Sequence, residues 1–144
     1  MTPSPLPPVF LHVPLAHRGL HDAAQGRIEN SASAFAAAIA AGYGIELDVQ
    51  RSADDVAVVF HDDDMDRLTD ATGAFRDRTA AELGRTLLAG GTDTIPTLQE
   101  VLALVAGRVP LLIEIKENWN TMQDTDGILE QSVAEALVGY GGPA

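Results

Sequence analysis

The hydrophobic residues of the chain are concentrated in four short runs, which are separated by longer segments with helical periodicity. The runs cover residues 13–16, 44–49, 56–60 and 111–116. They are continuously apolar rather than alternating, which is typical of parallel strands in a covered sheet. Helices are expected over 31–41, from 97 to 107 and over 125–139, with a less distinct one over 79–88. This order predicts an α/β fold built on a parallel sheet covered on both sides.

Capping residues support the expected helix boundaries. They are Asn30 or Ser31 and Gly42 for the first helix, and the pairs Thr79–Glu82 and Thr97–Glu100, at capping-box spacing, for two later ones. Residues 1–12 are expected to form an irregular lead-in, because four prolines among the first eight residues cannot pair into a sheet.

The run 44–49 carries two acidic residues in an otherwise apolar strand. Alternate side chains of a strand share a face, so Glu46 and Asp48 point the same way. The apolar residues Ile45, Leu47 and Val49 point to the other face. Two carboxylates side by side are costly unless something positive lies between them. Taken alone, the pair fits a solvated strand edge as well as it fits a metal site.

Each of the four expected strands carries charged or histidine residues at or near its C-terminal end. In a parallel barrel these ends meet at one rim, where the chemistry of such folds takes place. The residues are His17 and Arg18 after the first strand, Glu46 and Asp48 in the second, His61 after the third, and Glu114 and Lys116 in the fourth. We therefore expect three carboxylates, two histidines and two cations to converge on one site.

The residue types in this set indicate cleavage of a phosphoester. The three carboxylates offer hard oxygen ligands, which suit Mg²⁺ or Ca²⁺. Arg18 and Lys116 can hold the anionic oxygens of a phosphate group. Histidine side chains exchange protons near neutral pH, so His17 and His61 suit an acid and a base.

The charge balance limits the possible partners. Nine basic against 21 acidic residues give a formal net charge of −12 over 144 residues, which argues against nucleic acid and anionic membranes. The chain has no cysteine, which excludes disulfides, a thiolate nucleophile and a cysteine-based zinc site. No apolar run approaches about 18 residues, and no secretory signal is recognisable. We therefore expect no membrane insertion and a cytoplasmic location.

Six short motifs occur in order between residues 16 and 116. They are Ala16-His17-Arg18-Gly19, Glu29-Asn30-Ser31, Ile45-Glu46-Leu47-Asp48-Val49, Val59-Phe60-His61-Asp62, Ile95-Pro96-Thr97-Leu98 and Ile113-Glu114-Ile115-Lys116. Each alone is a weak signal, but as an ordered set they resemble the glycerophosphodiester phosphodiesterases. The resemblance implies a TIM-type (β/α)8 barrel that hydrolyses glycerophosphodiesters to an alcohol and glycerol 3-phosphate.

The resemblance also implies roles for single residues. The metal ligands of the family fall on Glu46, Asp48 and Glu114, its catalytic histidines on His17 and His61, its phosphate-binding cations on Arg18 and Lys116, and the acid of its Glu-Asn-Thr motif on Glu29.

The chain departs from the family pattern in two ways. Ile28 stands where the family has proline before that motif, and Ser31 replaces threonine, which is a mild change because both residues can cap a helix. The larger difference is length, since a TIM barrel takes about 250 residues and eight strands. We expect residues 13–144 to form the N-terminal half of such a barrel, with about four parallel strands. Its open edges predict self-association or marginal stability.

Three further residues are candidates for the site. Asp62 can orient the His61 imidazole. Glu29 can support the metal site indirectly, although a charge near a helix N-terminus is also favoured for other reasons. Trp119 follows Lys116 and can line the substrate site, or it can cover the core as a loop aromatic.

Two other functions fit the same residues. An unfinished barrel can be an inactive remnant that binds a divalent metal or serves as an assembly module. A sphingomyelinase D-like phospholipase shares the plan of histidines and carboxylates, but the lack of cysteine and of a secretion signal disfavours it.

Overall fold

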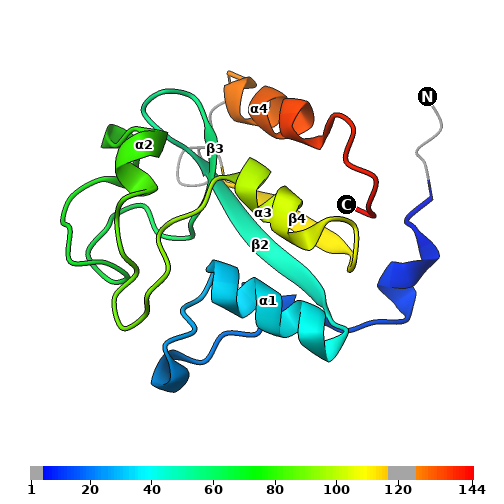
Figure 1. Cartoon of the computed structure of the whole chain (residues 1–144). Helices are drawn as coiled ribbons and strands as arrows, with labels where there is room; N and C mark the ends of the chain where they lie inside the picture. Colours follow the sequence, from blue (N-terminus) through cyan, green and yellow to red (C-terminus); the bar gives the residue numbers. More distant parts are fainter. Residues whose placement is uncertain (1–4, 117–125) are drawn as a thin grey trace.

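The computed structural model describes residues 5–116 and 126–144, and the statements below refer to these residues. Four strands form one open sheet (Figure 1). They are β1 (Leu15–His17), β2 (Gly44–Arg51), β3 (Ala57–Val59) and β4 (Leu111–Ile115).

Strand β2 is central and pairs with the other three. β1 and β4 run parallel to it on opposite edges, because Ile45 pairs with Ala16 on one side and with Leu111 on the other. β3 runs antiparallel to the last three residues of β2, where Val49 pairs with Val59. β3 therefore shares an edge of β2 with β1, at the opposite end of the strand.

The expectation of four parallel strands is wrong for β3. Only residues 52–56 connect β2 to β3, whereas a parallel crossover needs about a dozen residues or more. The short turn closes where the Ser52 N–H donates to the Val56 carbonyl at 3.0 Å, and Asp55 adopts a left-handed φ of 64°. The sheet thus contains three parallel strands, β1, β2 and β4. The fourth strand, β3, forms an antiparallel hairpin with the C-terminal end of β2.

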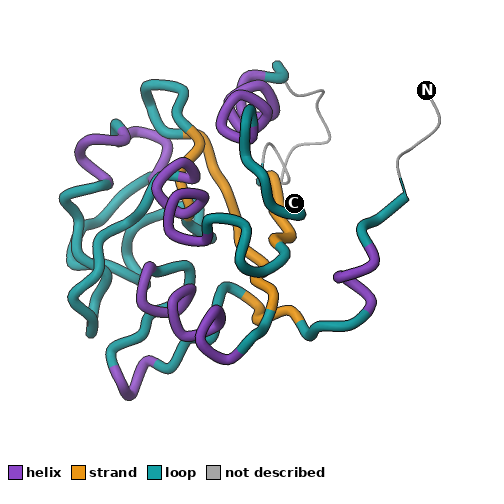
Figure 2. Tube along the Cα trace, turned by 45° about the vertical axis from the view of Figure 1, so that its right-hand side comes forward, coloured by secondary structure: helices purple, strands orange, loops and turns teal. Residues whose placement is uncertain are grey.

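Three helices lie in a row on one face of the sheet (Figures 1 and 2). They are α1 (Ala32–Ala41), α3 (Leu98–Val105) and α4 (Ile128–Leu137). The principal core lies between these helices and the apolar face of β2, where Phe35, Leu47 and Leu129 are fully buried. The expected cover of helices on both faces is therefore wrong, and the opposite face of β2 carries its acidic residues.

Residues 60–95 form a long excursion between β3 and α3, and most of a second hydrophobic core comes from this segment. It contains η3 (Phe75–Asp77) and the single turn α2 (Ala80–Leu83). Phe60 and Phe75 stack with their ring centroids 5.1 Å apart. We call this cluster, which also includes one residue before α1 and one in β3, the second core: Ile28, Val58, Phe60, Met65, Leu68, Phe75, Leu83, Leu88 and Ile95.

The caps expected from the sequence define the helix starts. The Ser31 hydroxyl accepts from the Ala34 N–H at the start of α1, and Thr97 forms a capping box with Glu100 at the start of α3. Thr79 caps α2 in the same way, but that helix ends at Leu83, well before residue 88.

The remaining elements are short 3₁₀ turns: η1 (Pro8–Leu11) within the expected lead-in and η2 (Ala23–Gln25) in the loop after β1. None of the described helices is long and apolar enough to cross a membrane.

Candidate active site

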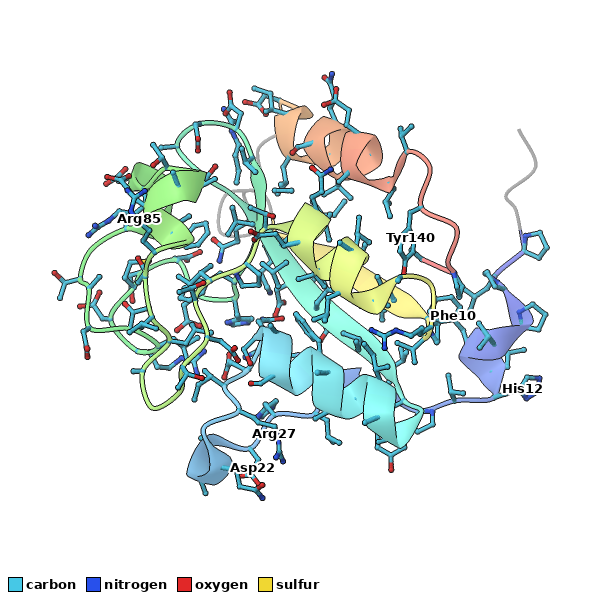
Figure 3. The ribbon with its side chains drawn as sticks, in the orientation of Figure 1. Phe10, His12, Asp22, Arg27, Arg85 and Tyr140 are labelled. Carbon is cyan, nitrogen blue, oxygen red and sulfur yellow. The ribbon has the colours of Figure 1, made fainter. Side chains whose placement is uncertain are left out.

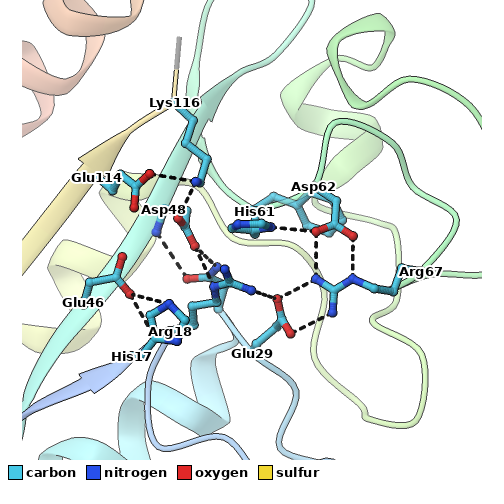
Figure 4. A network of polar contacts seen from close by, with 12 residues as sticks. His17, Arg18, Glu29, Glu46, Asp48, His61, Asp62, Arg67, Glu114 and Lys116 are labelled. Atoms are coloured by element: carbon cyan, nitrogen blue, oxygen red, sulfur yellow. Dashed lines mark hydrogen bonds and ion pairs between the residues drawn. The ribbon is translucent and has the colours of Figure 1, made fainter. Parts of the chain in front are cut away.

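Three carboxylates lie together on the face of the sheet that the helices leave uncovered (Figure 4). Glu46 and Asp48 alternate with the core-facing residues of β2, and Glu114 pairs with Asp48 in the register of β2 and β4. One carboxylate oxygen of each residue lies within 4.8 Å of those of the other two. The structure thus brings the three expected metal ligands within reach of a single ion.

Asp48 stands at the centre of this site, and its side chain is only 1% exposed. Its Oδ2 accepts a hydrogen bond from Asn30 Nδ2 at 2.9 Å and lies 3.3 Å from Arg18 Nε. Its Oδ1 lies 3.2 Å from Lys116 Nζ, which also donates to Glu114 Oε1 at 2.8 Å. Two cations therefore flank the buried charge, which would otherwise be very costly.

The loop after β1 places Arg18 over the acids. Arg18 has a left-handed φ of 56°, and its backbone N–H donates to Glu46 Oε2 at 3.0 Å. Its Nη1 donates to Glu29 Oε1 at 2.9 Å. Gly19 follows with a φ of 81°, and a Cβ at this position would lie 2.9 Å from the Cβ of Ala34. A glycine is therefore required for α1 to approach this loop so closely.

Both histidines border the acidic group (Figure 4). His17 ends β1, is 68% exposed, and has its Nε2 3.8 Å from Glu46 Oε2. His61 follows β3, and its Nδ1 lies 2.7 Å from Asp62 Oδ1. An ionised carboxylate can only accept, so Nδ1 of His61 carries the hydrogen in this contact.

Arg67 is a member of the site that the sequence does not predict. Its Nε and Nη2 donate to Asp62 at 2.6 and 2.8 Å, and its Nη1 and Nη2 donate to Glu29 at 2.9 and 2.8 Å. Arg67 thereby joins the loop after β1 to the loop after β3. In the sequence Arg67 directly follows the acidic segment 62–66, where an arginine is expected to be exposed to solvent.

Two amide side chains also belong to the site. Asn30, buried and with a φ of 55°, holds both the Asp48 carboxylate and, through its own N–H, the Arg18 carbonyl at 2.9 Å. Gln50 donates from Nε2 to the carbonyls of Phe60 at 3.0 Å and Asp62 at 2.7 Å, which fixes the start of the excursion. The alternation along β2 puts Gln50 on the face of Asp48, so a sequence signal for it existed.

Glu46 is a partly buried acid whose negative charge is incompletely compensated. Burial raises the pKa of its carboxyl, the Arg18 N–H opposes this rise, and the neighbouring charges of Asp48 and Glu114 add to it. A cation placed here would favour the ionised form of Glu46.

Glu29 and Asp62 show the opposite behaviour because Arg67 already supplies their positive charge. Hydrogen bonds from Arg67 lower the pKa of Asp62 to about 2, against the effect of burial. The same guanidinium lowers the pKa of Glu29. Although Glu29, His61 and Asp62 lie close enough together to ligate an ion, Arg67 supplies the positive charge of this second group.

Trp119, expected to line the substrate site, lies outside the described residues, so its role stays a prediction.

Comparison with known proteins assigns a family. The model of the glycerophosphoryl diester phosphodiesterase family matches residues 17–141, which is most of the chain. The chain belongs to this family. The match includes every site residue described above and confirms the resemblance carried by the six sequence motifs.

Individual phosphodiesterases align along most of the chain. The glycerophosphodiester phosphodiesterase of Bacillus altitudinis is 38% identical over 130 residues, which are 85% of this chain and 51% of the relative. A solved Oleispira antarctica phosphodiesterase, in complex with the product sn-glycerol-3-phosphate, gives a TM-score of 0.77 at 27% identity and covers 91% of this chain and 53% of that one.

A second solved structure extends the comparison. The glycerophosphodiester phosphodiesterase of Thermotoga maritima gives a TM-score of 0.71 at 35% identity, with 92% of this chain and 52% of that one covered. The chain thus spans about half the length of each of these relatives.

Proposed function

We propose that this chain carries the catalytic site of a phosphodiesterase that hydrolyses glycerophosphodiesters to an alcohol and glycerol 3-phosphate. The observation that carries the proposal is the convergence of three carboxylates, two cations and two histidines on one face of the sheet. Family membership gives this arrangement its substrate class, and the Oleispira antarctica relative holds the corresponding product.

The acidic group fits a divalent cation. Glu46, Asp48 and Glu114 provide only carboxylate oxygens, and the raised pKa of Glu46 marks a negative charge that the chain compensates incompletely. We propose that these three residues hold Mg²⁺ or Ca²⁺, the ions that such oxygen sets prefer. A bound divalent ion supplies positive charge to the oxygens on phosphorus.

Arg18 and Lys116 are the proposed phosphate-binding residues. Both reach the same carboxylate, Asp48, at 3.3 and 3.2 Å, so both can act on one anionic group beside it. Their contacts with Glu29 and Glu114 hold the two side chains in place before substrate arrives. Fixed positive groups of this kind stabilise charge that develops on the phosphate during reaction.

His17 and His61 are the proposed proton carriers. One accepts the proton of the attacking oxygen, and the other gives a proton to the oxygen of the leaving alcohol. For His61 the exchanging atom is Nε2, because Nδ1 faces Asp62. The exposed His17 is open to solvent and substrate. Both assignments of acid and base fit this arrangement.

We also propose that the sheet is the N-terminal half of a (β/α)8 barrel. Its three parallel strands pack against helices on one face, as barrel strands do, and β2 and β4 carry acids on the other face. The Ile45 N–H donates to the Pro110 carbonyl between β2 and β4, and the Leu111 N–H donates to the Pro143 carbonyl at 3.0 Å in the same way. This contact supports the proposal that the outer edge of β4 can pair with a further parallel strand.

An inactive remnant that binds a divalent metal is the second candidate, because the chain spans about half the length of its relatives. Incubating the purified chain with glycerophosphocholine, in Mg²⁺ or Ca²⁺ and in chelator, separates the two. The phosphodiesterase releases glycerol 3-phosphate only with the metal, whereas a remnant binds the metal without turnover.

Histidine variants test the assigned chemistry. His17→Ala and His61→Ala should each abolish turnover while the affinity for the metal, measured by titration calorimetry, remains near that of the wild type. His12→Ala is the matched control, because His12 is exposed on the N-terminal lead-in, away from the site (Figure 3). An unchanged rate in either site variant would refute the assignment.

A further inference from the structure

Arg67 forms the link between two parts of the site that the chain builds separately. It contacts Asp62, which holds the His61 imidazole, and Glu29, which holds Arg18. A continuous chain of hydrogen bonds therefore runs from His61 through Asp62, Arg67 and Glu29 to Arg18 (Figure 4). No contact of Arg67 reaches the carboxylates proposed to bind the metal, among the described residues.

The backbone around Arg67 is fixed by the second core. Met65 is fully buried there and Leu68 is 8% exposed, so a buried apolar side chain anchors the backbone on each side of Arg67. The Met65 N–H donates to the Gly73 carbonyl at 2.9 Å, and the Thr69 N–H donates to the Met65 carbonyl at 3.1 Å. The guanidinium is thus presented to the site from a preformed support rather than from a loose loop.

We propose that Arg67 is a positioning residue, which orients His61 through Asp62 and Arg18 through Glu29. This inference deepens the proposed function and rests on it for the roles of His61 and Arg18. Its basis is the planar guanidinium, which donates to both oxygens of two carboxylates at once.

The sharing of single oxygens shows how the orientation is transmitted. Asp62 Oδ1 receives both Arg67 Nη2 at 2.8 Å and the His61 Nδ1–H at 2.7 Å. Glu29 Oε1 receives both Arg67 Nη2 at 2.8 Å and Arg18 Nη1 at 2.9 Å. Neither carboxylate can turn away from its catalytic neighbour without breaking its bonds to Arg67.

Arg67→Met and Arg67→Lys are the informative substitutions. Methionine keeps much of the side-chain length but removes every donor, and we expect kcat/KM to fall by about 10- to 100-fold, as for other residues that orient catalytic groups. Lysine restores the charge without the fork, so it should recover only part of the loss. Arg85→Met is the matched control, because Arg85 is exposed on the far side of the excursion (Figure 3).

The two arms of the contact can be separated kinetically. Asp62→Asn weakens the link to His61 and should lower mainly kcat, whereas Glu29→Gln weakens the link to Arg18 and should raise mainly KM. Arg67→Met should change both parameters, and each double variant with Arg67→Met should cost less than the sum of the single variants. Additive effects would overturn the proposal.

Nitrogen NMR of ¹⁵N-labelled imidazole provides a readout that needs no turnover. In the wild type, neutral His61 should be mainly the Nδ1–H tautomer, and in Arg67→Met the Nε2–H tautomer should increase. An inactive wild type with this NMR change would refute the proposed function but support the positioning of His61. An unchanged tautomer, or kcat/KM within about twofold of wild type, would overturn the inference. So would a lower melting temperature without any NMR change, since this indicates a structural role only.

Discussion

Replacing Asp48 with asparagine removes the negative charge at the centre of the site while keeping the shape of the side chain. An amide oxygen at this position can still accept the hydrogen bond from Asn30 Nδ2. Arg18 and Lys116, however, lose the charge that lies 3.3 and 3.2 Å from them. Asp48→Asn therefore isolates the electrostatic contribution of this carboxylate.

The expected cost follows from the burial of the three groups. Breaking a buried ion pair costs about 3–5 kcal/mol, because one charge is left without its partner. Here Arg18 keeps Glu29 and Lys116 keeps Glu114, and the repulsion between Asp48 and Glu46 disappears. We therefore expect the free energy of unfolding to fall by about 2–3 kcal/mol in the absence of metal.

Urea unfolding followed by circular dichroism, in chelator at neutral pH, measures this loss. The control is Asp55→Asn, which breaks an exposed ion pair with Arg51, and it should cost less than about 1 kcal/mol. Asp48→Asn should also abolish any stabilisation by Mg²⁺ or Ca²⁺. If it unfolds at the urea concentration of the wild type, the two cations do not depend on Asp48 and the reasoning is wrong.

Four further predictions follow from the same structure. At a concentration of about a hundred times its Kd, Mg²⁺ or Ca²⁺ should stabilise the wild type by about 2.7 kcal/mol, and chelator should reverse this effect. Glu114→Gln should not be stabilised, and equal thermal shifts in the wild type and this variant would contradict the metal site. Because Arg67 lowers the pKa of Asp62 to about 2, ionised Asp62 stabilises the fold by up to about 2 kcal/mol above pH 4, and this contribution disappears as the pH falls toward 2. The urea unfolding curves of wild type and Asp62→Asn should therefore converge on acidification, and a constant gap would exclude this cause. Burial raises the pKa of Glu46, so its charge at neutral pH opposes folding, and Glu46→Gln should raise the unfolding free energy of the metal-free protein rather than lower it. Finally, the open edge of β4 should cause self-association or marginal stability, which sedimentation and urea unfolding test; a monomer that unfolds cooperatively at high urea would contradict it.

The parts of the site that the sequence predicts depend on local geometry. The two-residue period of a strand places Glu46 and Asp48 on one face whatever surrounds them, and the same period places Glu114. The caps at Ser31 and Thr97 likewise depend on contacts within a few residues. These features could be predicted because the chain determines them over short distances.

The features that were not predicted depend on contacts between residues far apart in the sequence, or on the length of a connecting segment. The short connection 52–56 is enough to indicate that β3 is antiparallel to β2. The expectation of a regular barrel, in which all strands are parallel, gave the wrong direction for this strand. The Arg67–Glu29 contact joins positions 38 residues apart, and no periodicity links them. Of the two expected caps of α1, Asn30 or Ser31, it is Ser31 that caps the helix, while the Asn30 side chain is buried against Asp48.

The second core has a consequence for the dynamics of the protein. The second core holds the excursion 60–95 against Ile28 and Val58, and the excursion carries His61, Asp62 and Arg67. Such a unit can open as a separate cooperative module while the sheet and its three helices stay folded. We expect native-state hydrogen exchange to show faster amide exchange here than in β2, so that on heating His61 leaves the proposed site before the sheet unfolds.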